Sequence, residues 1–416
     1  MSEGQEQELP MADDPRSYIA GDRRRALVSG EPMADRVQGA GLFADISGFT
    51  PLTEALATEL GPRRGAEELV SNLNRILAAI IEDLHRFDGE VIYFSGDAIT
   101  CWLDGDDGSR AVACALEMQD TMERVGTVVN EDGSTVDLAL KAAVAVGQAR
   151  RFVVGDPDVQ LIDVLAGSLI DDLAAAEQVA AKGEIILDES ALAALANDVA
   201  IGDMRTDGER RFGVATGLHG RVGMVEPRSE LEPVSSFEAR KWLLPPVYET
   251  LSTGGAAFIA ELRTVFPVFI RFGGIDFDDD PDAADKLDDF VRRAQHVLDS
   301  HGGNLLQLTL GDKGAYLYAV FGSPQAHEDE ATRSVSAALE LQALADVTAA
   351  AGIQIGISTG RVLSGTCGHP LRRTFACLGD PVNLAARLMS EAPARGVLVT
   401  DEVAAAADER YLWDQH

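Results

Sequence analysis

Apolar residues in the first part of the chain follow two different spacings, and their order predicts a strand, a helix and a hairpin. Gly39 to Ile46 is a short apolar run without helical spacing, which is typical of a buried strand, and Pro51 suits the first turn of a following helix. From Arg63 to His85 the apolar residues recur at three- and four-residue intervals, which predicts a long amphipathic helix covering one sheet face. A hairpin is expected over 89–102, with its turn at Ser95-Gly96-Asp97.

The same spacing arguments predict further α+β structure up to about Val225. The expected elements are a helix over 108–124, paired strands over 138–147 and 150–154, a helix over 168–182 and a strand over 184–187.

The order of elements then begins again after a proline-containing segment from Pro227 to Pro246. Phe43 to Phe49 corresponds to Phe269 to Ile275. Three further pairs correspond: 96–98 with 311–313, 165–172 with 378–384, and 183–188 with 396–401. A repeat of this length indicates two duplicated domains, which commonly pair around a pseudo-two-fold axis and form two related clefts.

We therefore divide the chain into four parts. They are a weakly ordered N-terminal lead-in without assigned chemistry (1–35), a first domain (36–225), a linker (226–260) and a second domain (261–416).

Composition narrows the classes of function that the chain can have. A formal net charge of -33 argues against broad binding of nucleic acid or anionic membranes, because both need clustered Lys and Arg. The chain has four cysteines without a C-x-x-C pair, which fits a reduced, cytoplasmic setting. No run approaches the roughly 18 apolar residues of a membrane span. The acidic run Asp276 to Asp289 is interpreted as a solvated loop and helix start.

Candidate chemistry lies at the strand ends of the first domain. Asp45 and Asp97 each follow apolar strand residues, and together they offer a hard oxygen pair suited to Mg²⁺. Gly48 lets the backbone approach a ligand, and the helix entered at Thr50-Pro51 would turn free N–H groups toward an anion. Taken alone, Asp45 is better explained as a capping residue in an ordinary strand-to-helix turn.

The second domain carries different groups. Asp380 can cap a helix with Pro381 in its first turn, and Asn383 and Arg387 then share one helix face at a spacing of four residues. An amide and a planar guanidinium can reach one ligand from there.

Each domain lacks the candidate site residues that the other domain has. The first has Asp171 and Ala175 at the positions of Asn383 and Arg387, and the second has Arg271 at the position of Asp45. We therefore expect one complete cleft and one inactive cleft.

With these motifs in order, the chain resembles the tandem catalytic domains of class III adenylate and guanylate cyclases, and in particular the soluble-adenylyl-cyclase-like group. The resemblance covers about 36–416 and rests on F-A-D-I-S-G-F-T, G-D-A, an L-x-x-K strand ending in G-D, G-D-K-G-x-Y-L-Y-A-V-F-G, A-H-E-D and G-D-P-V-N-L-A-A-R-L. It implies an α+β fold of two class III cyclase, ferredoxin-like-derived domains, paired as an intramolecular pseudo-two-fold heterodimer.

The resemblance also implies roles for individual residues. Asp45 and Asp97, with the Ile46 carbonyl, would hold two Mg²⁺ or Mn²⁺ ions. Asn383 would orient the ribose and Arg387 would stabilise the transition state. The implied nucleotide-binding set is Gly48, Phe49, Thr50, Lys141 for the terminal phosphates, Gln307, Ala376 and Cys377.

Two departures from the family pattern bear on specificity and regulation. Gln307 and Ala376 stand where the family usually reads adenine with a Lys and a polar residue, and Lys313 is an alternative base contact. Tyr93 and Ala174 stand where bicarbonate-responsive members carry cations, so bicarbonate activation by that route is not expected.

The resulting prediction is an enzyme that converts ATP to 3′,5′-cyclic AMP and pyrophosphate at a single interdomain site. The alternatives are a pseudo-cyclase that serves as the nucleotide-sensing or regulatory head of a larger signalling protein, and a cyclase of relaxed or GTP specificity. The expected partners are ATP or GTP and regulatory domains downstream of this chain, without nucleic acid and without a membrane span.

Overall fold

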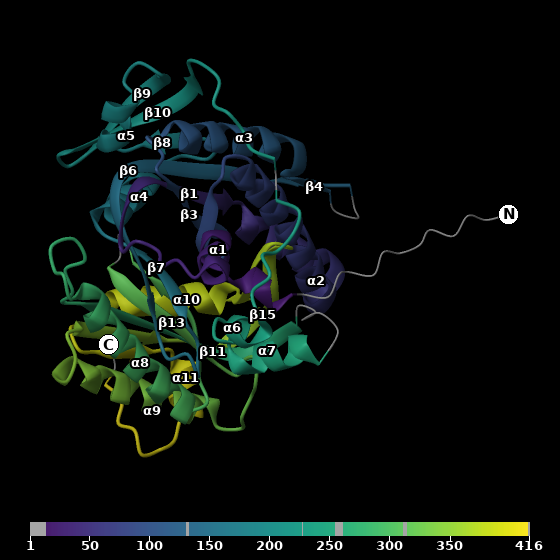
Figure 1. The fold of residues 1–416 in the computed structure, drawn as a ribbon. Coiled ribbons are helices and arrows are strands. Elements are labelled where there is room, and N and C mark those ends of the chain that lie inside the picture. The colour runs from purple at the N-terminus through teal and green to yellow at the C-terminus, as the bar shows by residue number, and fades with distance from the viewer. Residues whose placement is uncertain (1–13, 130–132, 227, 254–260, 311–313, 415–416) are drawn as a thin grey trace.

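The fold is described from a computed structural model that covers residues 14–129, 133–226, 228–253, 261–310 and 314–414. The first half of the chain forms one sheet with its helices, and the second half forms another beside it (Figure 1). A small separate hairpin pairs β4 (Thr127–Val129) with β5 (Thr135–Asp137).

The first sheet has the spatial order β2-β3-β1-β6-β8-β10-β9 within the described chain, and β7 pairs with the end of β6. β1 is antiparallel to β3 and β6, whereas β6 and β8 are parallel. The strands are β1 (Arg36–Ser47), β2 (Glu90–Ser95), β3 (Ala98–Asp104), β6 (Ala139–Val154), β7 (Ile162–Ala166), β8 (Ile185–Leu187), β9 (Val199–Asp207) and β10 (Arg210–Leu218).

The second sheet repeats this plan. Its order is β12-β13-β11-β14-β17, with β15 paired to both β11 and β16, and β14 runs parallel to β17 as β6 does to β8. The shared strand order agrees with the internal repeat predicted from the sequence. The strands are β11 (Glu261–Gly273), β12 (Asn304–Thr309), β13 (Ala315–Phe321), β14 (Ala351–Ile357), β15 (Gly360–His369), β16 (Arg372–Leu378) and β17 (Val397–Val399).

Helices cover the two sheets in matching positions. α2 (Phe49–Arg86) and α3 (Ser109–Val125) share one core with the first sheet, and α4 (Ser168–Gln178) packs on the opposite face. In the second half α8 (Ala283–Ser300) and α9 (Glu330–Ala343) share a core, and α10 (Asp380–Glu391) packs opposite. The shorter helices are η1 (Pro15–Tyr18), α1 (Gly21–Ser29), α5 (Glu189–Ala194), α6 (Ser236–Arg240), α7 (Pro245–Ser252), η2 (Leu344–Asp346) and α11 (Asp401–Ala406).

Side-chain alternation in β1 decides which face carries the chemistry. Ala40, Leu42, Ala44 and Ile46 are all fully buried in the core shared with α2 and α3. Because successive strand residues point to opposite faces, Asp45 projects from the other face, on which α4 packs.

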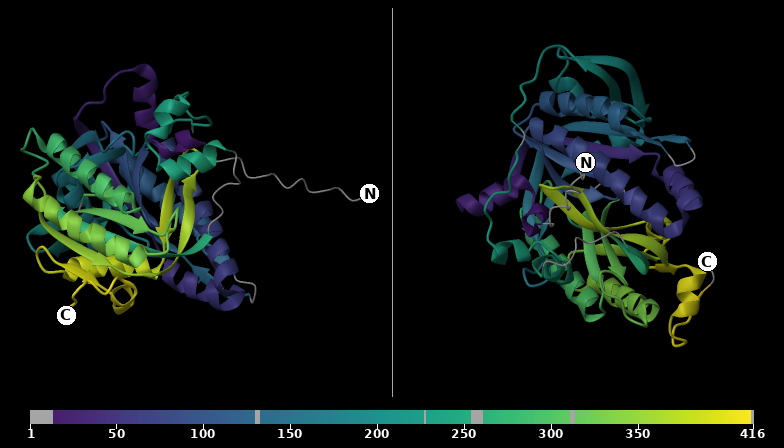
Figure 2. Two further views of the ribbon diagram at one scale, coloured as in Figure 1. Left: turned by 90° about the horizontal axis from the view of Figure 1, so that it is seen from below. Right: turned by 90° about the vertical axis from the view of Figure 1, so that its right-hand side faces the viewer.

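The two halves complete each other's cores. The end of β6 and β7 contribute Phe152 and Val164 to the core of the second half, where they join α8. In return, β15 lies along α2 and places Cys367 in the core of the first half. Figure 2 shows the yellow hairpin of β15 and β16 beside the purple-blue helix α2.

Three expectations from the sequence are wrong. Residues 139–154 form one continuous strand, not two paired strands, because the second part of that strand is buried by the other half. Residues 15–18 and 21–29 of the lead-in form two short, partly buried helices, because Arg23 and Arg24 are paired with distant acids. The helix expected over 168–182 ends at Gln178.

Two other segments differ in detail from the expectation. The long helix begins at Phe49, before the range expected from its apolar spacing, and is broken at Gly61, whose φ is 77° and ψ is 168°. The linker region contains two short helices, α6 and α7, and the buried Trp242 and Leu243 lie between them.

Candidate active site

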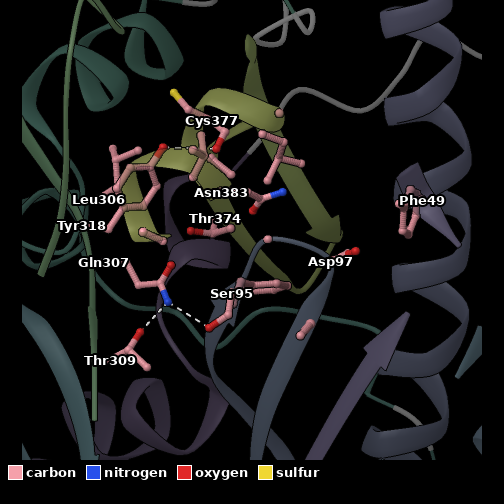
Figure 3. A pocket seen from close by; sticks show the side chains of 18 of the residues that line it. Phe49, Ser95, Asp97, Leu306, Gln307, Thr309, Tyr318, Thr374, Cys377 and Asn383 are labelled. Atoms are coloured by element: carbon pink, nitrogen blue, oxygen red, sulfur yellow. Dashed lines mark hydrogen bonds between the residues drawn. The ribbon is translucent and has the colours of Figure 1, made fainter. Parts of the chain in front are cut away.

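A cavity of about 680 Å³ is lined by residues of both halves. The first half contributes Asp45, Phe49 and Asp97, and the second half contributes Gln307 and Asn383. Figure 3 shows Asp97 and Asn383 reaching this cavity from different elements. Predicted groups of both repeats therefore line one cavity, whereas Ile46, Gly48, Lys141 and Arg387 are not among the described residues that line it.

The two predicted metal carboxylates are neighbours in the first sheet. Asp45 pairs with Ala98 in the β1–β3 ladder, so Asp97 in the β2–β3 turn lies directly beside this pair. The turn depends on Gly96, whose φ of 72° favours glycine. The Ile46 N–H donates to the Asp97 carbonyl at 3.3 Å, which fixes the turn against β1. Burial, and then the negative charge of Asp45, raises the pKa of Asp97 to about 7.

This donor set fits a hard divalent cation. Within the described residues no group of three or more His, Cys, Asp or Glu side chains forms a metal cluster. Mg²⁺ commonly binds through one or two carboxylates and takes its other ligands from water and substrate phosphates. The repulsion between Asp45 and Asp97 that raises the Asp97 pKa is also what a bound cation would relieve. The residues present therefore suit Mg²⁺ or Mn²⁺.

Lys141 lies opposite Asp45 in the β1–β6 ladder. Its Nζ is 3.2 Å from Asp45 Oδ2 and 2.5 Å from Oε1 of Glu177 on α4. Partial burial alone would lower the pKa of Lys141, but the Glu177 carboxylate, followed by that of Asp45, outweighs this effect and raises the pKa. The lysine is therefore a charged group next to the metal carboxylates.

The turn between β1 and α2 contains the predicted anion-facing residues. Gly48 is the N-cap of α2 with φ 109°, and its carbonyl accepts the Leu52 N–H at 3.3 Å. Phe49 lines the cavity. The backbone of Thr50 lies in the first turn of α2, and its side chain lies outside the described part of the structure.

α10 presents the amide and the guanidinium from one face. Asn383 and Arg387 are both exposed, and Asn383 lines the cavity. No hydrogen bond or ion pair of Arg387 is found among the described residues, so its guanidinium is available to a ligand. The expectation that Asp380 caps this helix is wrong: the chain turns at Gly379, which is the N-cap, and Asp380 is already helical.

Residues of the predicted base pocket come from β12 and β16. The Gln307 side-chain amide donates to Ser95 Oγ at 2.8 Å and to Thr309 Oγ1 at 2.5 Å (Figure 3). Ala376 and Cys377 line the same cavity, with the Cys377 side chain buried. Ser95 belongs to the first half, so the contact with Gln307 links the base pocket to the turn that carries Asp97.

The two positions at which bicarbonate-responsive family members carry cationic side chains are Tyr93 and Ala174 in this chain. Tyr93 and Ala174 both line the cavity, and the Tyr93 hydroxyl donates to the Leu310 carbonyl at 3.4 Å. Lys313, the alternative base contact, lies outside the described residues, as does the stretch 311–313 that was matched with 96–98.

At the positions where one half has a candidate site residue, the other half has a different residue. Arg271 lies in β11 where Asp45 lies in β1, since Asp45 pairs with Lys141 of β6 and Arg271 pairs with Gln354, the corresponding residue of β14. Asp171 and Ala175 lie on α4, which corresponds to α10. A second complete set of these groups is therefore missing from the described residues.

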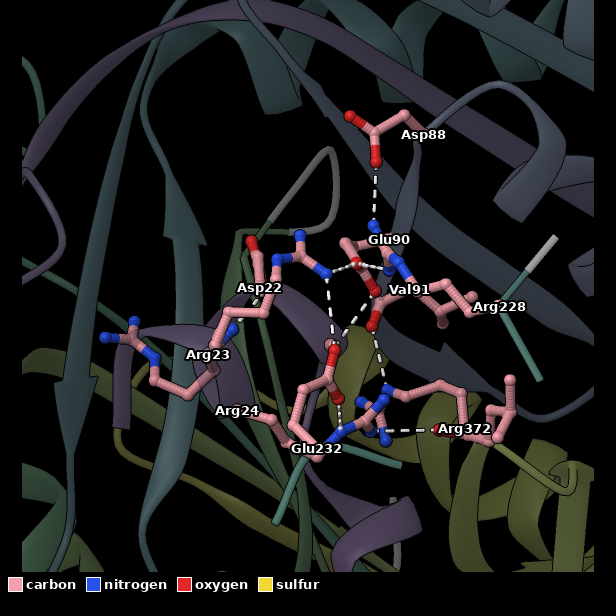
Figure 4. Close-up of polar contacts among 12 residues, drawn as sticks. Asp22, Arg23, Arg24, Asp88, Glu90, Val91, Arg228, Glu232 and Arg372 are labelled. Carbon is pink, nitrogen blue, oxygen red and sulfur yellow. Dashed lines mark hydrogen bonds and ion pairs between the residues drawn. The ribbon is translucent and has the colours of Figure 1, made fainter. Parts of the chain in front are cut away.

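The N-terminal segment and the linker hold the strands that carry this site (Figure 4). Arg24 on α1 is 2% exposed; its guanidinium donates to Glu232 Oε2 at 2.5 Å and to the Leu371 carbonyl at 2.9 Å. Arg228 of the linker pairs with Glu90 at the start of β2. One charge network thus joins the lead-in, the linker and both halves.

Arg372 on β16 is the buried centre of this network. Its guanidinium donates to the Val91 and Ile92 carbonyls of β2 at 2.8 and 2.7 Å, and to the Tyr18 carbonyl at 3.1 Å. Burial lowers the pKa of Arg372 to about 10, so it remains charged at neutral pH. β2 leads to Asp97 and β16 leads to α10, so Arg372 ties together the two strands that position the opposite sides of the cavity.

Sequence reasoning missed Glu177, Ser95 and Arg372. The first two lie in ordinary helix and strand patterns, and only the folded chain brings them to Lys141 and Gln307. Arg372 left no signal either, because it begins β16 beside Arg373 and only the folded chain shows that its side chain is buried.

Comparisons with known proteins show which proteins the chain is similar to. The model of the adenylate and guanylate cyclase catalytic domain matches residues 281–415. Adenylate cyclase type 10 of Oryctolagus cuniculus is 26% identical over 406 residues, covering 89% of this chain, and that of Homo sapiens is 25% identical over 405 residues with the same coverage. By these matches the chain is similar to adenylate and guanylate cyclases.

Among solved structures, the fold of this chain resembles that of a class III adenylyl cyclase-like ATP-binding protein from Pseudomonas aeruginosa. The TM-score is 0.59 with 13% identity, over 96% of this chain and 95% of the other. The chain spans about a quarter of the length of the curated relatives, since 25% of each is covered. None of the described helices is both long and apolar enough to cross a membrane.

Proposed function

We propose that this chain is a class III cyclase that converts ATP to 3′,5′-cyclic AMP and pyrophosphate at one site between its two halves, which act as a pseudo-two-fold heterodimer. One observation carries the proposal: the cavity receives Asp45 and Asp97 from one half and Asn383 from the other, with Arg387 one turn further on α10. The reaction needs the ribose 3′ oxygen to attack the α-phosphorus while pyrophosphate leaves, and no side-chain nucleophile is required.

The side chains of the cleft divide the work between binding and transition-state stabilisation. Lys141 binds the terminal phosphates, because it is a charged donor beside the metal carboxylates. Asn383 orients the ribose from the cavity wall. Arg387, unpartnered within the described chain, is aimed at negative charge that builds up on the phosphoryl oxygens during transfer.

Two Mg²⁺ or Mn²⁺ ions held by Asp45, Asp97 and the Ile46 carbonyl would lower the pKa of the ribose 3′ hydroxyl and neutralise the triphosphate. The N–H groups at the start of α2, around Gly48 and Phe49, face the anion. Supporting this use of the turn, Phe49 lines the cavity.

Base selectivity is proposed to be weak. The side-chain amide of Gln307 already donates hydrogen bonds to Ser95 and Thr309, and Ala376 has no polar side-chain atom that could contact a base. Strong discrimination requires that a mismatched base leave buried polar groups unpaired, and this pocket has few of them. GTP is therefore the second substrate to test.

We further propose a reduced cytoplasmic setting, supported by four cysteines that are all free and buried. The curated relatives are longer than this chain, and we propose that this part of the sequence supplies the nucleotide chemistry to a larger signalling protein. A pseudo-cyclase head that binds nucleotide without turnover is the competing function.

Turnover separates these functions directly. Purified chain is incubated with Mn²⁺ and either ATP or GTP, and cyclic nucleotide and pyrophosphate are quantified. We expect cyclic AMP from ATP, an ATP preference over GTP below about a thousandfold, and loss of product in Asp45→Ala and Asp97→Ala. Nucleotide binding without product in the parent would establish the pseudo-cyclase instead.

A further inference from the structure

The Lys141 ammonium, beside the cleft, is shared by two carboxylates that line it. Lys141 Nζ lies 2.5 Å from Glu177 Oε1 and 3.2 Å from Asp45 Oδ2. The three side chains are only 21%, 24% and 22% exposed, respectively, so solvent screens their charges incompletely. Glu177 also lines the cavity, although it belongs to α4, the helix that lacks the ribose and transition-state groups.

The partners of Lys141 have opposite consequences for ligands. An ammonium held against Asp45 opposes the approach of a divalent cation to that carboxylate. An ammonium held by Glu177 is drawn away from Asp45, but a polyphosphate must then compete with Glu177 for it. Lysine can pivot between these positions because its ammonium is a point charge with rotatable donors on a flexible stem.

We propose that Glu177 is a positioning residue that acts through Lys141. It draws the ammonium off Asp45, which favours binding of a divalent cation, and it competes with the polyphosphate for the same ammonium, which weakens nucleotide binding. This inference rests on the proposed function, because it assumes that Asp45 binds a metal ion and that Lys141 binds the terminal phosphates of the nucleotide.

The second half supports a shared role for the two residues. Gln354 pairs with Arg271 as Lys141 pairs with Asp45, and it donates to a backbone carbonyl. Met389 is buried on α10 at the position that Glu177 has on α4, six residues after Asn383 and Asp171, respectively. The lysine and the glutamate therefore occur together, in the half that has the metal carboxylate.

The test measures the two binding equilibria separately in the full chain, without turnover. Mn²⁺ binding in the absence of nucleotide is followed by electron paramagnetic resonance of free Mn²⁺, and ATP binding in excess EDTA is followed by calorimetry. For Glu177→Gln we expect Mn²⁺ to bind about fivefold more weakly and ATP about fivefold more tightly, as expected for one partly exposed ion pair. Glu177→Asp keeps the charge and should shift both affinities less.

Asp172→Asn is the matched control, because it removes one negative charge from the same helix at a carboxylate that faces Arg210 at 3.6 Å. It should leave both affinities unchanged. If Glu177→Gln shifts neither affinity, or shifts both in the same direction, Glu177 only anchors α4 and the inference fails. In that case a parent that still forms cyclic AMP leaves the proposed function intact, whereas a parent that binds no ATP overturns both.

Discussion

α10 lies unusually close to the sheet beneath it, and one glycine permits this. A Cβ built on Gly356 of β14 would lie 2.2 Å from the Ala385 carbonyl oxygen and 2.3 Å from the Met389 nitrogen, both in the α10 backbone. The first half has Ala143 at the corresponding position, since Ala143 pairs with Phe43 as Gly356 pairs with Phe269.

The substitution Gly356→Ala should therefore displace the helix that carries the ribose and transition-state groups. Carbon atoms pack at about 3.5 Å, so α10 must move away from β14 by about 1 Å. Overpacking of this kind costs about 1 to 3 kcal/mol of unfolding free energy. A 1 Å displacement of catalytic groups can cost about 10² in rate, so we expect kcat to fall by about that factor while the protein stays folded.

The measurement is steady-state cyclic AMP formation with saturating Mn²⁺ and ATP, with thermal melting followed in parallel. Gly217→Ala in β10 is the control, because a Cβ at Gly217 meets no atom within 4 Å. It should change neither quantity. A Gly356→Ala protein with parental kcat and an unchanged melting temperature would refute the reasoning, because α10 would then tolerate the added carbon without moving.

Two further outcomes follow from the described contacts. Arg387→Ala should lower kcat by about 10² to 10³ with little change in nucleotide affinity or melting temperature, and Arg387→Lys should be nearly as poor; kinetics and melting curves for each variant check this. Burial raises the pKa of Asp83 to about 6 despite the hydrogen bond from Thr121, so the folded state holds this proton more tightly than the unfolded state does. The resulting stabilisation is complete below about pH 4 and disappears as the pH rises through 6. Asp83→Asn should flatten the pH dependence of the unfolding free energy over that range. Urea titrations at several pH values measure this free energy, and the same dependence on pH in parent and variant would contradict the prediction.

Local patterns were enough for the elements that carry the carboxylates. The apolar spacing predicts a strand over 39–46 and a hairpin with its turn at 95–97, and the structure has β1, β2 and β3 at these places. Asn383 and Arg387 share a helix face because of their four-residue separation, which also needs no tertiary information.

Contacts between distant segments explain what the sequence did not reveal. The interruption near Gly147 divides two apolar runs, yet β6 continues through it because Phe152 beyond it packs in the core of the second half. Arg23 and Arg24 resemble a solvated basic cluster, but their carboxylate partners Asp163 and Glu232 are 140 and 208 residues away in sequence. Glu177 was missed for the same reason, since helix periodicity does not say which strand residue a helical side chain will reach.

The exchange of strands between the halves also constrains how the chain is made. The end of β6 and β7 is synthesised well before α8, which supplies the apolar surface that covers Phe152 and Val164. Because chains generally fold from the N-terminal side during synthesis, the first half emerges from the ribosome with this strand pair uncovered. Uncovered apolar strands are sites of aggregation, so a nascent chain paused between the halves should depend on chaperones until the second half arrives.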